Sequence, residues 1–158
     1  MFDFRHRITE PYKTHRIMCG AIIVMDEKIT LVQKASKKFH GRWGLPEGII
    51  AKGENIFESA KRKVHEQTNL SIHLRGLVGI YNWYSEETRS TEIHYIFLAS
   101  DPKGTSKPNI SEILPIKEFS MAEIMAMPDA SFSYPQFRQV IKDYRRGKLY
   151  PLEVINIL

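Results

Sequence analysis

The sequence predicts an α+β domain in which helices cover a mixed β-sheet. Three observations lead to this fold class. Apolar runs rich in β-branched residues, such as residues 17–25, are typical of buried strands. Residues 54–68 repeat apolar side chains at four-residue steps, as an amphipathic helix does. Strand-like and helix-like segments alternate irregularly along the 158 residues, which favours a mixed sheet within one domain.

Composition and charge exclude several classes of protein. Hydrophobic residues make up 42% and charged residues 26% of the chain, as in ordinary globular domains. No segment approaches the length of an apolar membrane span and the N-terminus does not resemble a signal peptide, so we expect no membrane partner. The single Cys19 cannot form an internal disulfide, and we expect a reducing, cytoplasmic location. The net charge of +5 is spread along the chain without a nucleic-acid-binding motif, so nucleic acid is not an expected partner.

The first part of the chain is predicted to contain an arm, a hairpin and a bent strand. Residues 1–14 are mixed and polar and form the expected N-terminal arm. The strands over 17–25 and 29–32 are separated by a short polar turn, and we expect them to pair as a hairpin. Residues 43–50 contain two glycines and a proline, which indicates a bent strand or a strand that enters a loop.

The middle of the chain is predicted to form one helix and three strands. The helix over 54–68 is expected to end at Asn69, because asparagine tolerates the left-handed conformation of a helix C-terminus. Strands over 74–84 and 93–99 follow, joined by a polar turn. A loop rich in Pro, Gly and Lys then leads to a short strand over 113–119.

Two helices complete the predicted fold. Residues 121–127 form the shorter helix, which Pro128 ends. The longer helix spans 134–146, with Ser133 predicted as its N-cap and Gly147 as its stop signal.

The most informative stretch is residues 41–70, which read GRWGLPEGIIAKGENIFESAKRKVHEQTNL. It resembles the signature of the Nudix hydrolase family, G-x5-E-x7-R-E-U-x-E-E-x-G-U, in which U is an aliphatic residue. The matching positions are Gly48, Glu54, Arg62, Val64, Glu66 and Leu70. The flanking segments extend the resemblance over nearly the whole chain. It implies a single Nudix-like domain over 1–158, built as an α/β/α sandwich with a mixed β-sheet and a C-terminal helix.

The signature places three side chains of one helix face together. Residues 63, 66 and 67 are three and four positions apart, so carboxylates there would hold Mg²⁺ or Mn²⁺, and the metal would offset the charge of a diphosphate. This sequence carries Lys63 and Gln67 instead, and the formal charge of the trio falls from minus three to zero. A lysine ammonium has no acceptor for a metal, whereas Gln67 keeps a carbonyl oxygen as a weak ligand. The signature is therefore degenerate, and the expected Mg²⁺ (or Mn²⁺) site is weakened.

Four residues are candidates for metal binding and catalysis. The resemblance implies Glu66 as metal ligand and catalytic carboxylate, with Gln67 beside it. Glu47 is a candidate replacement metal ligand and Glu112 a candidate catalytic carboxylate, although surface exposure is the simpler interpretation of each. His94 is expected to be a satisfied, half-buried strand residue.

The candidate substrate contacts surround the start of the helix. Lys63 and Arg62 would contact phosphate oxygens, and Gly48 would allow close approach of the backbone. Arg62 is also expected to pair with Glu54 or Glu58 and to hold the preceding loop, with Glu58 favoured as the helical partner one turn away.

Two functions from different classes fit these residues. The first is a hydrolase that cleaves a diphosphate bond in a nucleoside diphosphate linked to another moiety, with altered metal dependence. The alternative is a catalytically inactive sensor that binds a nucleotide or diphosphate. Trp83 would stack on the nucleobase in either case, or simply pack at the rim of the core. A homodimer is the further expected partner.

Overall fold

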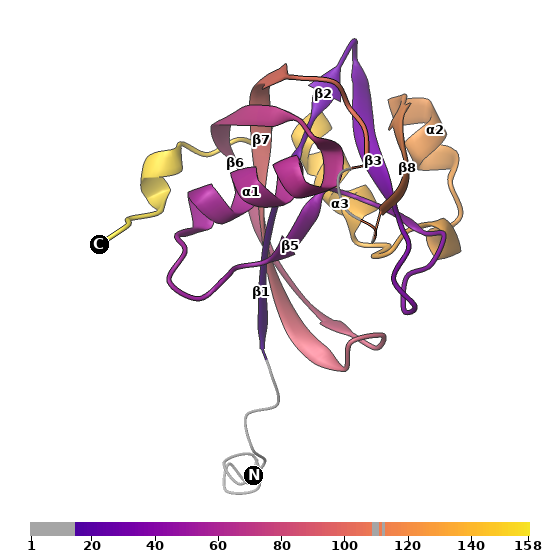
Figure 1. Ribbon diagram of the computed structural model, residues 1–158, viewed down its shortest axis with the longest axis horizontal. Helices are drawn as coiled ribbons and strands as arrows, with labels where there is room; N and C mark the ends of the chain where they lie inside the picture. The colour runs from indigo at the N-terminus through magenta and orange to yellow at the C-terminus, as the bar shows by residue number, and fades with distance from the viewer. Residues whose placement is uncertain (1–14, 109–110, 112) are drawn as a thin grey trace, which may run out of the picture.

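Two β-sheets form the centre of the fold, which the computed structural model describes for residues 15–108, 111 and 113–158 (Figure 1). The first sheet has the strand order β5-β1-β7-β6, and in the second β3 pairs with β2, β4 and β8. The strands are β1 (Arg16–Ile22), β2 (Val24–Met25), β3 (Lys28–Lys34), β4 (Trp43–Gly44), β5 (Glu47–Ile49), β6 (Ser71–Ser85), β7 (Ser90–Lys103) and β8 (Ile113–Phe119).

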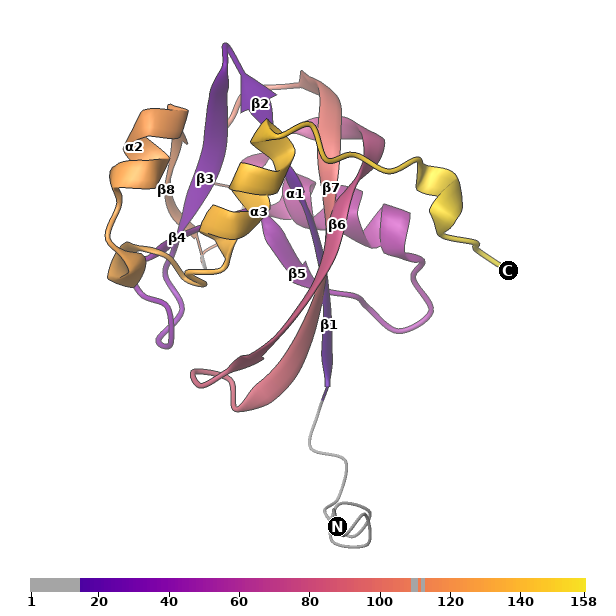
Figure 2. The same ribbon diagram turned by 180° about the vertical axis from the view of Figure 1, so that it is seen from behind.

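Helices cover the sheets on both sides and confirm the predicted sandwich. Helix α1 (Ile56–Thr68) lies on one side of the first sheet in Figure 1, and α3 (Phe137–Arg145) lies on the opposite side in Figure 2. Helix α2 (Met121–Ala126) lies beside β8. Short 3-10 turns over Asp129–Ser131 and Leu152–Val154 precede and follow α3. In the described part of the chain, no helix has the length and apolar character needed to cross a bilayer.

Helix α1 begins and ends where its capping residues dictate. The side chain of Asn55 accepts hydrogen bonds from the backbone N–H groups of Phe57 and Glu58, so the helix begins two residues later than predicted. Asn69 has φ 61° and ends the helix in the left-handed conformation, which confirms the prediction for that residue. The Asn55 cap fixes the start of α1, which follows the loop after β5.

Alternation along β1 separates the two halves of the core. Cys19 and Ala21 pack with the apolar stripe of α1, whereas Ile22 packs with the residues beneath α3. Cys19 is fully buried, and burial raises the pKa of its thiol to about 11. Residues that follow one another on β1 therefore face different environments.

Two strand predictions are corrected by the pairing. The predicted strand 17–25 is interrupted at Ile23, and only β2 forms the hairpin with β3 across a turn in which Asp26 and Glu27 have positive φ. Strand β1 instead runs parallel to β7 and antiparallel to β5. The predicted bent strand 43–50 divides in the same way, because β4 joins the second sheet and β5 the first.

The start of the last helix also differs from the prediction. Helix α3 begins at Phe137, its N-cap position is Gln136, and no side chain caps it. Ser133 was the predicted cap, but its backbone N–H donates to the carbonyl of Trp43 at 2.7 Å. That hydrogen bond ties Ser133 to β4 and draws it away from the helix. Gly147, with φ 80°, follows the helix as predicted.

Candidate active site

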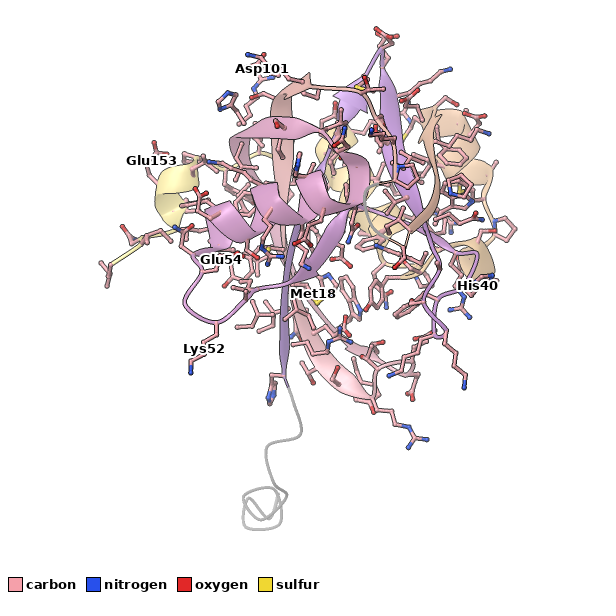
Figure 3. All side chains as sticks on the ribbon, in the orientation of Figure 1. Met18, His40, Lys52, Glu54, Asp101 and Glu153 are labelled. Carbon is pink, nitrogen blue, oxygen red and sulfur yellow. The ribbon has the colours of Figure 1, made fainter. Side chains whose placement is uncertain are left out.

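A pocket of about 280 Å³ opens beside β5, between the two sheets and the C-terminal half of α1. Strand β5 is the edge strand of its sheet, so groups from both faces of the sheet border the pocket. Met18, labelled in Figure 3, lies on its wall. The polar and charged side chains that line it include Arg16, Lys34, Glu47, Lys63, Gln67 and Tyr134. Three of these six side chains are cationic.

The loop before α1 is fastened to the helix by a bidentate ion pair. Arg62 donates from Nε to Glu54 Oε2 at 2.6 Å and from Nη2 to Oε1 at 2.9 Å. The hydrogen bonds from Arg62 lower the pKa of the Glu54 carboxyl to about 2. Glu58 pairs with Lys61 at 3.4 Å instead, so the preference for Glu58 as the partner of Arg62 is corrected and the alternative, Glu54, is confirmed. Bidentate geometry and the closeness of the loop favour Glu54.

Both oxygens of Glu66 are engaged by cations of its own helix. Arg62 Nη1 donates to Oε1 at 2.8 Å, and Lys63 Nζ donates to Oε2 at 3.0 Å. Partial burial works against the charge of Glu66, but the hydrogen bonds from Arg62 and Lys63 outweigh it and lower the pKa of the carboxyl. Glu66 is therefore a neutralised carboxylate at the surface of α1.

Gln67 fastens α1 to β5 through its amide group. Its Nε2 donates to the carbonyl of Glu47 at 2.7 Å, and its Oε1 accepts from the backbone N–H of Glu47 at 3.3 Å and from Lys34 Nζ at 3.3 Å. An amide can donate to one backbone group and accept from the other, whereas an ionised carboxylate can only accept. This contact explains why an amide suits position 67 in this chain.

Lys63 crosses β5 at Gly48. A Cβ atom at Gly48 would lie 2.6 Å from Lys63 Cδ, so any other residue there would require the lysine side chain to move. The glycine of the signature thus supports close approach here, but the group that approaches is the substituted lysine.

A buried chain of charged groups lies on the other face of β5. Glu47 Oε2 contacts His94 Nδ1 at 2.6 Å, and His94 Nε2 contacts Glu92 Oε2 at 3.0 Å. Glu92 Oε1 also accepts from Thr88 Oγ1 at 2.6 Å and from Arg16 Nη1 at 3.4 Å. The exposed fractions of the Glu47, His94 and Glu92 side chains are 2%, 0% and 0%. We call these three residues the buried triad.

The buried triad holds a protonated imidazole. Burial opposes the charge of His94, but Glu47 and Glu92 outweigh burial and raise the pKa of the imidazole to about 9. Burial similarly works against the charge of Glu92, yet hydrogen bonds from His94, Thr88 and Tyr134 lower its pKa. At neutral pH an imidazolium therefore bridges two carboxylates, and Arg16 adds a second positive charge.

Aromatic rings fix the imidazole in place. Trp83 stacks on His94 with ring centroids 3.9 Å apart and planes at 18°, and Tyr134 meets its edge at 5.2 Å. Trp83 also packs against the core beneath α3. The structure thus places Trp83 against His94, and it is not among the described residues that line the pocket.

The residues present do not fit a bound Mg²⁺ or Mn²⁺. Glu66 is paired at both oxygens, the carbonyl oxygen of Gln67 is engaged, and Lys63 supplies no acceptor. Glu47 and Gly48 point to opposite faces of β5, so Glu47 is directed away from the side that Lys63 and Glu66 occupy. Within the described residues, no three acidic, histidine or cysteine side chains form a cluster able to hold a metal.

The structure brings some predicted site residues together and separates others. Glu47, Lys63 and Gln67 line one pocket, whereas Glu66 lies beside it on α1. Glu112 lies outside the described residues. Glu47 is buried, not an exposed loop residue, and His94 is fully buried, not half-buried. These two expectations are corrected because β5 aligns beside β1, which in turn aligns beside β7.

Sequence reasoning missed the contributions of Arg16 and Lys34 to this region, and it considered Glu92 as a weaker candidate carboxylate without placing it beside His94. Their signal is weak, because a charged residue in a predicted strand is ordinarily solvated. The alternation Glu92, His94, Ile96 places two ionisable side chains on the same face as a core residue, and this was the available clue.

Comparison with known proteins gives one consistent result. The family model described as "NUDIX domain" matches residues 14–140. The ADP-ribose pyrophosphatase of Methanocaldococcus jannaschii is 28% identical over 132 residues, which are 84% of this chain and 74% of that protein. Several other curated relatives are longer, and the chain spans about a third of their length.

Solved structures resemble the fold over most of its length. A NUDIX hydrolase from Nitrosomonas europaea has a TM-score of 0.84 and 27% identity, covering 92% of this chain and 98% of that chain. The NUDIX domain of Shewanella oneidensis NrtR, solved in complex with ADP ribose, has a TM-score of 0.71 and 21% identity, covering 93% and 99%. The second likeness concerns the fold alone.

Proposed function

Since this chain belongs to the NUDIX family, we propose that it is a pyrophosphohydrolase that cleaves the diphosphate bond of a nucleoside diphosphate linked to another moiety. ADP-ribose is the first substrate to test, because a relative over 84% of this chain is named for its hydrolysis. The bond broken is the anhydride between the two phosphorus atoms, and the products are two phosphate monoesters.

The cationic lining of the pocket is the observation that carries this proposal. Arg16, Lys34 and Lys63 border the same space, and the acid beside them, Glu47, is already paired with His94. A diphosphate carries negative charge that such a lining complements. Lys63 and Lys34 would act as point charges on the phosphate oxygens.

The remaining predicted residues have supporting roles in this proposal. Arg62 binds Glu54 and keeps the loop against α1, and Gly48 lets Lys63 reach over β5. Fixed cations then supply the charge neutralisation that a metal cluster supplies elsewhere, so we propose a reduced requirement for Mg²⁺ or Mn²⁺. Glu66 and Glu112 remain candidate catalytic carboxylates.

The test is a hydrolysis assay with ADP-ribose, a sugar nucleotide and a nucleoside triphosphate, each with Mg²⁺, with Mn²⁺ and with EDTA. We expect AMP and ribose 5-phosphate from ADP-ribose, with turnover that persists in EDTA. Lys63→Met should raise KM at least several-fold, because it removes a cation from the pocket lining. Glu66→Gln and Glu112→Gln identify any role of those carboxylates. Absence of turnover under every condition would contradict the proposal.

A second candidate is a diphosphate-binding protein without turnover. The pairing of both Glu66 oxygens with Arg62 and Lys63 favours it, because this carboxylate is not available to organise a metal-bound water. Saturable binding of ADP-ribose in EDTA by calorimetry, without product, would support this candidate over the hydrolase.

A further inference from the structure

We infer that Glu47 is the proton acceptor for the attacking water, and that His94 and Glu92 are positioning residues that fix its carboxylate at the wall of the pocket. The inference rests on the proposed hydrolysis and names the group that drives it. The observation behind it is the buried triad. The cationic lining of the pocket would complement a diphosphate without this triad, so the triad needs its own explanation.

The three side chains of the buried triad are almost completely removed from water. Removing ionised groups from water costs several kcal/mol each, and replacing a buried ion pair with apolar residues of similar volume is often neutral or stabilising. The buried triad therefore is not explained by stability. Clusters of ionisable groups at the wall of a pocket are instead typical of functional sites.

The position of Glu47 at the pocket is the second observation. Among the described residues that line the pocket, Glu47 is the one acid. Its contact with His94 uses Oε2, and no side chain in the described part of the chain donates a hydrogen bond to Oε1. Gln67 holds the backbone of Glu47 through both its N–H and its carbonyl. The backbone of Glu47 and its Oε2 are thus both held, which leaves Oε1 without a side-chain donor among the described residues.

His94 and Glu92, which support the Glu47 carboxylate, are themselves held by several contacts. His94 donates from both ring nitrogens, to Glu47 and to Glu92, and Trp83 stacks on its face. Glu92 is itself held by Arg16 and by a hydroxyl from the turn before β7. A carboxylate held in this way keeps its geometry through the reaction, which is what positioning of a general base requires.

Glu66 is the other carboxylate beside β5, and its contacts differ from those of Glu47. That carboxylate accepts from Arg62 and Lys63 at both oxygens, so abstracting a proton would require it to break an ion pair. Glu47 needs no such rearrangement at Oε1. Of the two carboxylates beside β5, Glu47 is therefore the one with an oxygen that no side chain of the described residues holds.

The step balances without any co-reactant beyond water. The water oxygen forms a bond to one phosphorus atom while its proton passes to Glu47 Oε1. The bond from that phosphorus to the bridging oxygen breaks, and the bridging oxygen leaves on the second phosphate. The proton then passes from Glu47 to solvent or to the departing phosphate, which restores the carboxylate.

The experiment compares kcat and KM for ADP-ribose in the parent, Glu47→Gln, His94→Gln and the control Glu153→Gln. Glu153 is exposed and lies in the C-terminal turn labelled in Figure 3. General bases contribute about 100-fold or more, so Glu47→Gln should lower kcat by roughly that factor with KM changed less than about threefold. His94→Gln should lower kcat by about tenfold at similar KM, and Glu153→Gln should match the parent.

A second variant protects the test against misfolding. Should Glu47→Gln fail to fold by circular dichroism, Glu47→Asp keeps the charge but withdraws the carboxylate, and we expect its kcat to fall at least about tenfold. Equal kcat in the parent and in every folded Glu47 variant would overturn the inference while leaving the proposed hydrolysis intact. A parent without turnover on any substrate would overturn both.

Discussion

Two groups of charged side chains flank β5, and they differ chiefly in burial. The helix group lies at the surface of α1 and of the loop before it, and consists of Glu54, Arg62, Lys63 and Glu66, whose side chains are 20–33% exposed. The buried triad of Glu47, His94 and Glu92 is nearly inaccessible to solvent. The helix group occupies the signature in which chemistry was predicted, whereas the buried triad comes from strands far apart in the sequence.

The difference shows where loss of an interaction would cost most. The ion pairs of the helix group are screened by water, so each contributes little to stability. The buried triad has no solvent to replace a lost partner, so removal of one member leaves a buried charge without compensation. Burial, not the number of ion pairs, therefore ranks the effects expected of substitutions in the two groups.

The largest effect is expected at the centre of the buried triad. His94→Ala leaves two carboxylates without their shared partner and removes a ring on which Trp83 stacks. We expect the free energy of unfolding to fall by about 3–5 kcal/mol, measured by urea denaturation. His73→Ala, at an exposed position of β6, is the control and should change stability by less than about 0.5 kcal/mol. A loss below about 1 kcal/mol at His94 would mean that the buried triad is not charged.

A smaller effect is expected from pH alone. The pKa of His94 is raised to about 9 in the folded protein, so the protonated form stabilises the fold. This contribution is complete below the unfolded pKa of about 6.5 and is lost as the pH rises through about 9, and it amounts to on the order of 3 kcal/mol. Urea midpoints of the parent should fall between pH 7 and 9.5, whereas those of His94→Gln should lack this component. Parallel curves for the two proteins would show that His94 does not titrate in this range.

The helix group was largely predictable because its contacts are local. The spacing of Arg62, Lys63 and Glu66 places them within reach on one helix, and Asn69 carries a backbone preference in its own side chain. The family signature covers the same stretch and predicts the sandwich in which the helix lies. The choice between Glu54 and Glu58 depended on the path of the loop, which helical spacing does not describe.

The buried triad was not predictable because it depends on long-range register. Glu47 meets His94 only because β5 aligns beside β1 and β1 runs parallel to β7. The hairpin predicted for residues 17–25 and 29–32 would have paired β1 with β3, and not with β5 and β7. Interpretation of Glu47 as an exposed loop residue followed from a loop-like sequence, PEG, although Glu47 and Gly48 belong to the edge strand β5.

The smallest of these effects is expected in the helix group, at the bidentate pair of Arg62 and Glu54. A double-mutant cycle with Arg62→Met and Glu54→Gln isolates the coupling between them, which we expect to be about 1 kcal/mol in low salt and smaller in high salt. Ion screening reaches this pair because Arg62 is 31% and Glu54 20% exposed at the side chain. Coupling of 3 kcal/mol or more, insensitive to salt, would contradict the ranking by burial, since the surface pair would then equal the buried triad. If the coupling is weak and the salt dependence of ADP-ribose turnover is the same in Arg62→Met as in the parent, the role of Arg62 is only to hold the loop.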